Sequence, residues 1–366
     1  MSLITINESL KQAVEAASGG AQTVLVTPKG QLTYMNVINK FDLSTIDSSM
    51  SGTHPAFIVN GVEKDKIYIG TYQGVIKNGE LLSLPNSDVS ISQSLNTNLT
   101  AVRTIGDGHH LMTAIEFGAL SMLASQAGKE VQGNTYYGRS GLDATQYGRR
   151  VDGQSATAGV NNSSGTGGNR IFSGSGPVSF RHNNKYNGVS DLVGNTADFT
   201  AGMRIVNTEL QIFTNNDAAI LTADLLDGGA WKAIDGATGN LVTPNGLGTT
   251  PGSIRITVTI APASAAPYSL IISANSQAAT AITNNSPTPI PTVAMNKLKA
   301  LGILTLNSNV QRGYLVVNSA QNVTGYAQRG GSASESGAGL FQLSLVTPIS
   351  SGTVGAGTVR PCYYAP

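Results

Sequence analysis

The stretch that decides the fold is Arg329-Gly-Gly-Ser-Ala-Ser-Glu-Ser-Gly-Ala-Gly-Leu-Phe-Gln-Leu-Ser-Leu345, near the end of the sequence. Its large apolar residues lie between Leu340 and Leu345, and the others are nearly all small or polar. A second glycine-containing stretch follows and leads to Val359, Arg360 and Cys362. Alternating apolar residues between glycines predict a short core strand framed by tight loops.

A related pattern lies upstream, in Asp191-Leu-Val-Gly-Asn-Thr-Ala-Asp-Phe199. Together with Arg329-Gly-Gly331, Gly339-Leu-Phe-Gln-Leu343 and Arg360, it resembles the C-type lectin fold of phage-associated ligand-binding proteins and of formylglycine-generating enzymes. In that family the first motif reads Asp-Leu-x-Gly-Asn-Val-Trp-Glu-Trp. The second motif contains Arg-Gly-Gly-x-Trp, Gly-x-Phe-x-Leu and Gly-Phe-Arg.

The chain keeps the order of these motifs and their glycines, but not their aromatic residues. Ala197, Phe199 and Ala333 stand where tryptophans are usual in the family. The segment 131–139 is similar to the family's Gly-Asn-x-x-Tyr-Gly loop, and the segments 33–41 and 54–62 resemble the N-terminal portion of prophage proteins of this kind. The resemblance therefore extends over most of the chain.

Composition limits the partners that the protein can have. Charged residues make up 12% of the 366 residues, and 22 Lys+Arg against 21 Asp+Glu leave a net charge of +1. No basic stripe is available to neutralise phosphates, so nucleic acid is not an expected partner. The 43 glycines favour short strands joined by many turns, which is typical of a loop-rich β protein.

Cysteine content and hydropathy bear on where the chain is made. The single cysteine, Cys362, cannot form an intramolecular disulfide, so folding does not require an oxidising compartment. The sequence lacks the basic start and apolar run of a signal peptide, and no apolar window is long enough to span a bilayer. We expect synthesis in the host cytoplasm without export, and no membrane insertion.

We predict an α+β fold with two parts. A β-rich N-terminal region for attachment or assembly occupies residues 1–100, and a C-type lectin-like domain with long loops occupies residues 101–366, with a β insertion at about 215–290. The expected strands are 23–27, 32–38, 56–59, 66–72 and 205–212, with a hairpin of 254–260 and 268–273. Asn60-Gly61, after the strand 56–59, is a hairpin signal. The expected helices are 7–18, 113–128 and 292–301.

The clearest local signal is a capping box at Thr113-Ala-Ile-Glu116. It predicts the start of the helix that, in the resembled family, packs beneath the sheet. The polar segment 85–100 is expected to link this helix to the N-terminal region, and 141–176 reads as a long loop that packs on other elements.

The most specific enzymatic hypothesis comes from the resemblance to formylglycine-generating enzymes, which use thiols and a copper ion to oxidise a substrate cysteine. That chemistry requires a reactive pair of cysteines, whereas this chain has only Cys362. A buried structural thiol is the favoured interpretation. A degenerate enzyme of this type stays as the alternative from another functional class.

Two polar clusters invite a metal-site interpretation. His109 and His110 follow Asp107-Gly, with His182 and Asp191 as candidate further ligands. Adjacent histidines on a strand point in different directions, so we favour packing and hydrogen-bonding roles for both.

The second cluster is Asp191, Asn195 and Asp198, which suits turn capping better than cation binding. The calcium-binding signatures of lectins of this fold are missing from the sequence. We therefore expect no metal and no cofactor.

The remaining candidate for a functional site is the polar surface between the two C-terminal motifs, which are the stretch that starts at Arg329 and the segment around Arg360. In the resembled family these positions carry the ligand contacts, and they vary in the members that retroelements diversify. On a strand of period two, Leu343 and Leu345 face the core and their neighbours face outward. An ordinary solvated loop region is the alternative for these positions. The predicted ligand-binding residues are Ser332, Ser334, Glu335, Gln342, Ser344, Val346, Thr347, Ile349, Ser350, Ser351, Thr353 and Val354.

The resemblance implies a non-enzymatic receptor-binding protein of a phage or prophage virion. Its partners would be a host cell-surface receptor, either protein or glycan, and other virion tail proteins. By analogy with related tail proteins a homo-oligomer is expected, with a homotrimer as the expected form. A structural decoration or baseplate component that binds no receptor is a further alternative.

Overall fold

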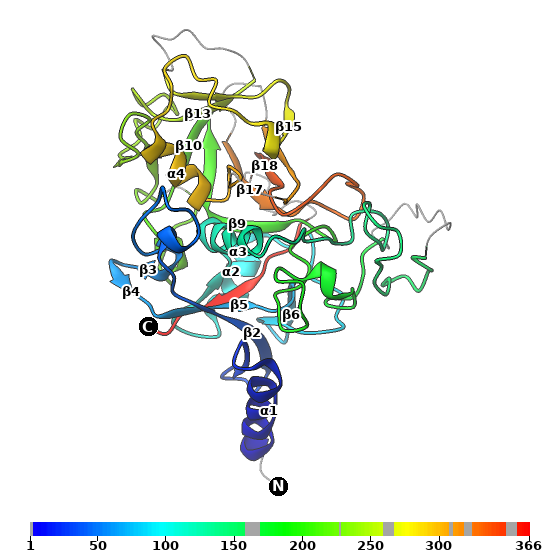
Figure 1. The fold of residues 1–366 in the computed structure, drawn as a ribbon. Coiled ribbons are helices and arrows are strands. Elements are labelled where there is room, and N and C mark those ends of the chain that lie inside the picture. The colour runs from blue at the N-terminus through cyan, green and yellow to red at the C-terminus, as the bar shows by residue number, and fades with distance from the viewer. Residues whose placement is uncertain are drawn as a thin grey trace.

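The computed structural model describes residues 3–157, 169–226, 228–258, 267–306, 310–317, 324–348 and 357–366. The described chain is a mixed α+β fold in which helices lie against open β-sheets (Figure 1). This confirms the predicted α+β class.

Within the described ranges, the lower sheet in Figure 1 has five strands in the order β1-β2-β5-β19-β8, and all neighbouring strands are antiparallel. The bounds of these strands are Gln22–Val26 for β1, Leu32–Asn39 for β2, Lys66–Gly70 for β5, Pro361–Tyr363 for β19 and His109–Leu111 for β8.

The last strand of the chain lies inside this sheet. Cys362 in β19 pairs with Ile69 of β5 on one side and with His110 of β8 on the other. The sheet therefore contains strands from both sides of residue 100, the predicted boundary between the two parts. Closing it requires the two ends of the chain to meet.

Among the residues that the structure describes, the upper sheet has ten strands, and its main path runs β12-β11-β10-β9-β17-β18-β16-β15. Strand β13 pairs with β10 and with β14. The bounds are Asp198–Val206 for β9, Glu209–Ile212 for β10, Lys232–Ile234 for β11, Leu241–Val242 for β12, Arg255–Thr257 for β13, Ser269–Ile271 for β14, Ser276–Ala278 for β15, Tyr314–Val317 for β16, Thr324–Arg329 for β17 and Leu343–Thr347 for β18.

Two small hairpins complete the strands. In the first, β3 (Ile58–Val59) pairs with β4 (Val62–Glu63), and in the second, β6 (Gly74–Lys77) pairs with β7 (Glu80–Ser83). Between β3 and β4, Asn60 and Gly61 have φ angles of 50° and 73°, as a tight hairpin turn requires. The Asn-Gly signal in the sequence predicted this turn correctly.

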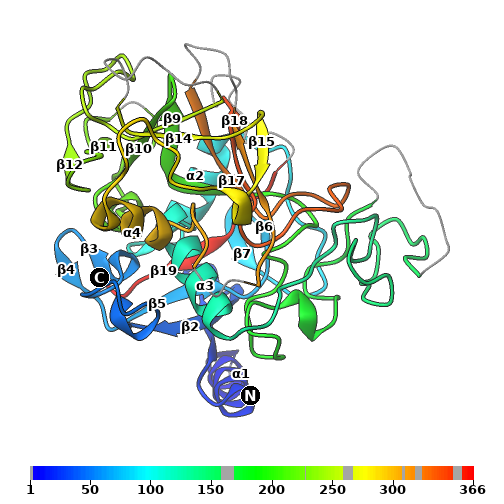
Figure 2. The same cartoon turned by 45° about the horizontal axis from the view of Figure 1, so that its top comes forward.

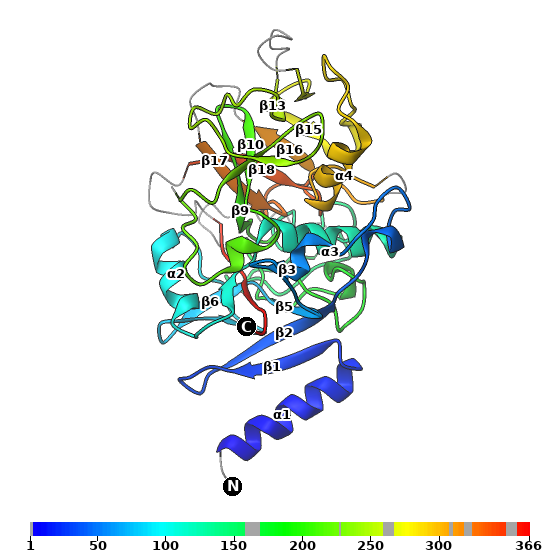
Figure 3. The ribbon, with the colours of Figure 1, turned by 90° about the vertical axis from the view of Figure 1, so that its left-hand side faces the viewer.

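Helix α3 (Ala114–Gln126) lies between the two sheets (Figures 1 and 3). Its residues are apolar on every side, and nearly all of them are buried, as expected for a helix that contacts protein all round. Phe117 and Leu120 belong to one core cluster with residues of both sheets, such as Ile69 and Met203. One hydrophobic core thus joins the sheets through this helix.

The capping box at the start of α3 is present as predicted. Thr113 Oγ1 accepts a hydrogen bond from the N–H of Glu116 at 3.2 Å, and Glu116 Oε2 accepts one from the N–H of Thr113 at 2.9 Å. Thr113 Oγ1 also donates to Asn216 Oδ1 at 2.7 Å. The cap therefore ties the helix to the segment after β10.

Replacing Thr113 with alanine is expected to lower the free energy of unfolding by about 1–2 kcal/mol. The change removes the acceptor of the Glu116 N–H and leaves the buried Asn216 oxygen without its donor. Chemical denaturation measures the loss. Thr113→Ser, which keeps the hydroxyl, is the control and should cost clearly less; an equal loss for both variants would mean that the methyl group, not the cap, matters.

The other helices lie at the outside of the core. Helix α1 (Leu3–Ser18) packs along β1 and extends away from the body of the protein (Figure 3), and none of its described side chains is fully buried. Helix α4 (Thr292–Ala300) was predicted correctly. Helix α2 (Leu95–Arg103) was not, because we assigned this segment to a polar link.

Two strand predictions were wrong. Residues 205–212 form not one strand but the hairpin of β9 and β10, because Asn207 and Thr208 turn with φ angles of 45° and 74°. The strands β13 and β14 were expected to form a hairpin, but they pair in parallel. The direction of pairing depends on where the connecting chain runs, and residues 259–266 of that connection are outside the described residues.

Candidate binding surface

Strand β18 has the predicted alternation. Leu343 and Leu345 are buried, whereas Ser344 between them and Val346 after them are half-buried. At the end of the strand, Thr347 is also half-buried, and its hydroxyl donates to Gln328 Oε1 of β17 at 3.1 Å. Ser344, Val346 and Thr347 line one edge of the surface that the sequence indicated.

The loop before β18 supplies the second edge. Ser334 and Glu335 are exposed and Ser332 is half-buried. Glu335 shapes its own loop, because its Oε2 accepts from the N–H of Ser332 at 3.1 Å and its backbone oxygen accepts from Ala338 at 2.8 Å. Side chains on this loop are therefore presented from a defined backbone.

Gln342 does not belong to the exposed surface. Only 7% of it is accessible, and its Oε1 accepts a hydrogen bond from the N–H of Tyr314 at 2.8 Å. The expectation of exposure failed because the strand begins at Leu343; the Gln342 N–H closes a turn onto Gly339 instead. The period of two does not extend to this residue. The remaining predicted residues, Ile349, Ser350, Ser351, Thr353 and Val354, lie outside the described residues.

Arg329 fixes the base of this surface. It is fully buried, and its two terminal nitrogens donate to the backbone oxygens of Leu301 and Gly302, each at 2.7 Å. Its guanidinium also stacks 5.3 Å from the ring centre of Phe117. Burial lowers the pKa of Arg329 to about 9, so the group is still cationic at neutral pH. It holds the start of the loop to α3 and to the end of α4.

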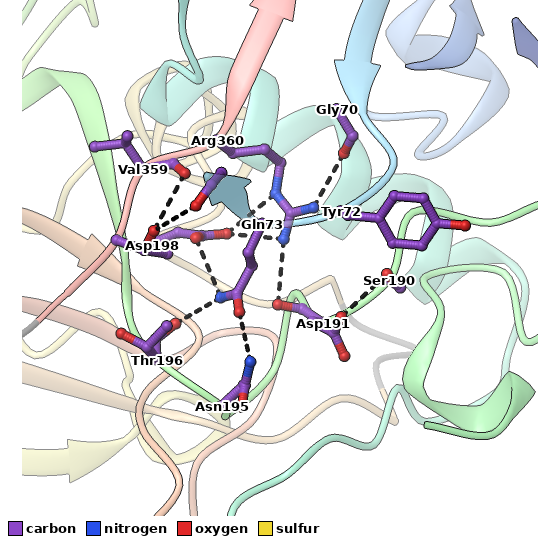
Figure 4. A network of polar contacts seen from close by, with 12 residues as sticks. Gly70, Tyr72, Gln73, Ser190, Asp191, Asn195, Thr196, Asp198, Val359 and Arg360 are labelled. Atoms are coloured by element: carbon purple, nitrogen blue, oxygen red, sulfur yellow. Dashed lines mark hydrogen bonds and ion pairs between the residues drawn. The ribbon is translucent and has the colours of Figure 1, made fainter. Parts of the chain in front are cut away.

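Arg360, just before strand β19, fixes the C-terminal segment to the rest of the protein (Figure 4). It is fully buried, and its Nε and one terminal nitrogen contact Asp198 Oδ2 at 3.1 and 3.0 Å. The other donors reach the backbone oxygens of Gly70 and Asp191. Burial raises the pKa of Asp198, and the charge of Arg360 offsets part of that rise. This ion pair links the C-terminal segment to β9 and β5.

Asn195 and Gln73 extend the network toward the loops (Figure 4). Gln73 Nε2 donates to Thr196 O and Asp198 Oδ1, and its Oε1 accepts from Asn195 Nδ2 at 2.9 Å. Asn195 Oδ1 in turn accepts from the N–H of Ile171 at 2.8 Å. The long loop 141–176 is thus attached to the core by amide groups.

The residues of the predicted cluster Asp191, Asn195 and Asp198 therefore have different roles. Asp191 Oδ2 accepts from the N–H of Gly174 at 2.7 Å, so Asp191 holds a turn, as expected. Asp198 forms an ion pair with Arg360 rather than capping a turn. Burial raises the pKa of Asp191.

A different trio of ligand-type side chains meets in the core. The side chains of His110, Glu116 and Cys362 offer atoms within 4.8 Å of one another. His110 Nε2 lies 2.9 Å from Glu116 Oε1, and its Nδ1 lies 2.9 Å from Gly108 O. Both ring nitrogens lie within hydrogen-bond distance of oxygen atoms, so contacts on two sides fix the orientation of the ring.

The contacts within this cluster shift the pKa values of Glu116 and Cys362. Burial acts to raise the pKa of Glu116, but His110 and the hydrogen bonds from Thr113 and Asn216 outweigh it, so the pKa is lowered. Burial and Glu116 raise the pKa of the Cys362 thiol well above its usual value. A neutral thiol is a poor metal ligand.

The expected companions of His110 are not in this group. His182 Nδ1 accepts from the N–H of Val189 at 2.8 Å, and burial lowers the pKa of His182 to about 4. His109 stacks 4.6 Å from the ring of Tyr363. The capping box was the sequence signal that could have placed Glu116 at this centre, but nothing local linked it to Cys362.

Comparison with protein-family models finds no match to this chain, and comparison with curated proteins finds no relative. In the part of the chain that the structure describes, none of the helices combines the length and apolar character needed to cross a membrane.

Proposed function

We propose that the chain is a receptor-binding protein of a phage or prophage virion, and that it grips a host-surface receptor through the surface formed by Ser332, Ser334, Glu335, Ser344, Val346 and Thr347. The observation that carries the proposal is the contrast between small, accessible side chains and the rigid buried groups beneath them. Such an arrangement allows the surface to change while Arg329 and Arg360 keep the backbone in place.

Small side chains give little binding energy per copy, because binding hot spots are usually large aromatic residues or arginine. Several copies on one particle would raise the avidity without any new contact. A homo-oligomer, such as a trimer, fits this need. Helix α1 extends from the body and suits attachment to other virion proteins.

Two alternatives remain, a degenerate formylglycine-generating-type enzyme and a structural virion component. The buried state of Cys362 favours binding over thiol chemistry, because a reactive thiol needs access and a lowered pKa. The half-buried residues of β18 and the exposed loop before it distinguish receptor binding from a purely structural role only through contact with a ligand, which a substitution tests.

Changing Ser344 and Thr347 together to tyrosine is expected to alter attachment to host cells while leaving the melting temperature nearly unchanged. Ser344 and Thr347 are only partly buried, and surface substitutions usually change stability by no more than about 0.5 kcal/mol. Bulky aromatic groups, by contrast, change interface contacts strongly.

Cell attachment and thermal unfolding are measured on the same samples. The control replaces Thr45 and Thr97, two exposed threonines on other elements, with tyrosine. Folded Ser344/Thr347 variants that attach like the parent protein would exclude this surface as the receptor site.

A further inference from the structure

A pocket of about 440 Å³ lies between α4 and the segment 43–55. Figures 2 and 3 show α4 beside the blue segment that contains these residues. Its size falls in the range of roughly 300–1,000 Å³ that is typical of small-ligand sites. It is separate from the surface formed by β18 and its preceding loop.

The walls of the pocket are mostly apolar. Met50 and Ala300 belong to a small core cluster that forms its base, and Leu43 packs against that cluster. Val293 stands at the pocket with 57% of its surface exposed. Asn296 fixes the opposite wall, because its Nδ2 donates to the backbone oxygen of Ser49 at 2.8 Å. An aliphatic chain in this pocket would have apolar contacts on several sides.

Lys297 gives the pocket its charge. It is half-buried, and among the described residues it has neither a hydrogen-bond acceptor nor a carboxylate partner. Its neighbour Lys299 differs, since it pairs with Asp47 at 3.2 Å. Burial lowers the pKa of Lys297. None of the residues that line the pocket is acidic.

Partial burial of an ammonium group costs free energy, because the group loses part of its hydration. A bound anion would offset this cost by forming a charge-assisted hydrogen bond with the ammonium. The apolar walls select for a ligand that joins this anion to a hydrocarbon body. We infer that the pocket binds an aliphatic carboxylate, with the carboxylate at Lys297 and the chain along Leu43, Met50 and Val293. This inference does not depend on receptor binding by the β18 surface.

The first test uses decanoate as the probe and isothermal titration calorimetry on the full chain. Decanoate should bind with one site per chain, and decylamine, which has the same chain with a positive head group, should not. Lys297→Met keeps the aliphatic stem and removes the charge, so it should weaken binding by about tenfold or more. Lys77→Met, at an exposed lysine on β6, is the matched control and should bind like the parent protein.

Two further measurements keep the test decisive if Lys297→Met folds poorly. Val293→Glu places a carboxylate at the exposed edge of the pocket and should abolish decanoate binding. Acetylation of lysines by an N-hydroxysuccinimide ester, located by peptide mass spectrometry, should be slowed at Lys297 by decanoate and unchanged at Lys77. Absent binding, equal binding of decylamine, or binding that survives both Lys297→Met and Val293→Glu would overturn the inference.

Discussion

Replacing Arg360 with methionine is expected to lower the free energy of unfolding by about 3–5 kcal/mol. The change leaves Asp198 buried as an uncompensated carboxylate, and it removes the donors that Gly70 and Asp191 use. A loss of this size is a large part of the total stability of an ordinary domain. Denaturant unfolding monitored by fluorescence and circular dichroism measures it.

The matched control is Arg312→Met. Arg312 also forms an ion pair, at 3.0 Å from Glu130, but 56% of its side chain is exposed. Water solvates both partners there, so the expected loss is below about 1 kcal/mol. If the two variants lose similar amounts, the burial of the Arg360 pair has no special energetic role. A double variant, Arg360→Met with Asp198→Asn, should recover part of the loss because it removes the unpaired charge.

Ending the chain at Arg360 is expected to abolish cooperative unfolding. The truncation removes β19, which pairs with β5 on one side and β8 on the other, and it removes the fully buried Cys362. Both neighbouring strands then expose backbone donors and acceptors in the middle of a sheet. The cost should exceed the whole stability of roughly 5–15 kcal/mol that is typical of a folded protein.

The control for this truncation removes only Ala365 and Pro366, which are exposed. That shorter deletion should leave the unfolding transition close to that of the parent protein. Thermal melts of the three proteins compare them directly. A cooperative transition in the chain that ends at Arg360 would show that β19 is dispensable for the fold.

Local signals in the sequence predicted the elements that depend on neighbouring residues. The capping box at Thr113 and Glu116 fixed the start of α3 to within one residue, and Asn60-Gly61 fixed a hairpin. Helix α2 was missed because its apolar face is short; Leu95, Ala101 and Val102 are its buried apolar residues. Its burial depends on contacts with β7 and β8, which no local pattern contains.

Long-range pairing could not be derived from the sequence. Cys362 was expected to be buried, and it is. Its place between Ile69 and His110, however, depends on pairing between strands that are far apart in the sequence, and β5 and β19 are almost three hundred residues apart. The parallel pairing of β13 and β14 has the same origin. For such contacts the sequence gives the apolar residues but not their partners.

The candidate surface was predicted in part. The alternation of Leu343, Ser344 and Leu345 has the expected burial, whereas Gln342 is turned inward by the bend that precedes the strand. Lys297 gave no signal in the sequence, because a lysine on a short helix is ordinarily solvated. Only the packing of α4 against the segment 43–55 reveals that it is half-buried.

The most direct test of the central claim is whether the purified protein binds host cells through the β18 surface. Fluorescently labelled protein is titrated against a panel of candidate host bacteria. We expect the binding of the parent protein to saturate and to be displaced by unlabelled protein. We expect the Ser344/Thr347 tyrosine variant to bind differently from the parent protein. Binding that never saturates on any strain, or saturable binding that is identical for the variant, would contradict the central claim.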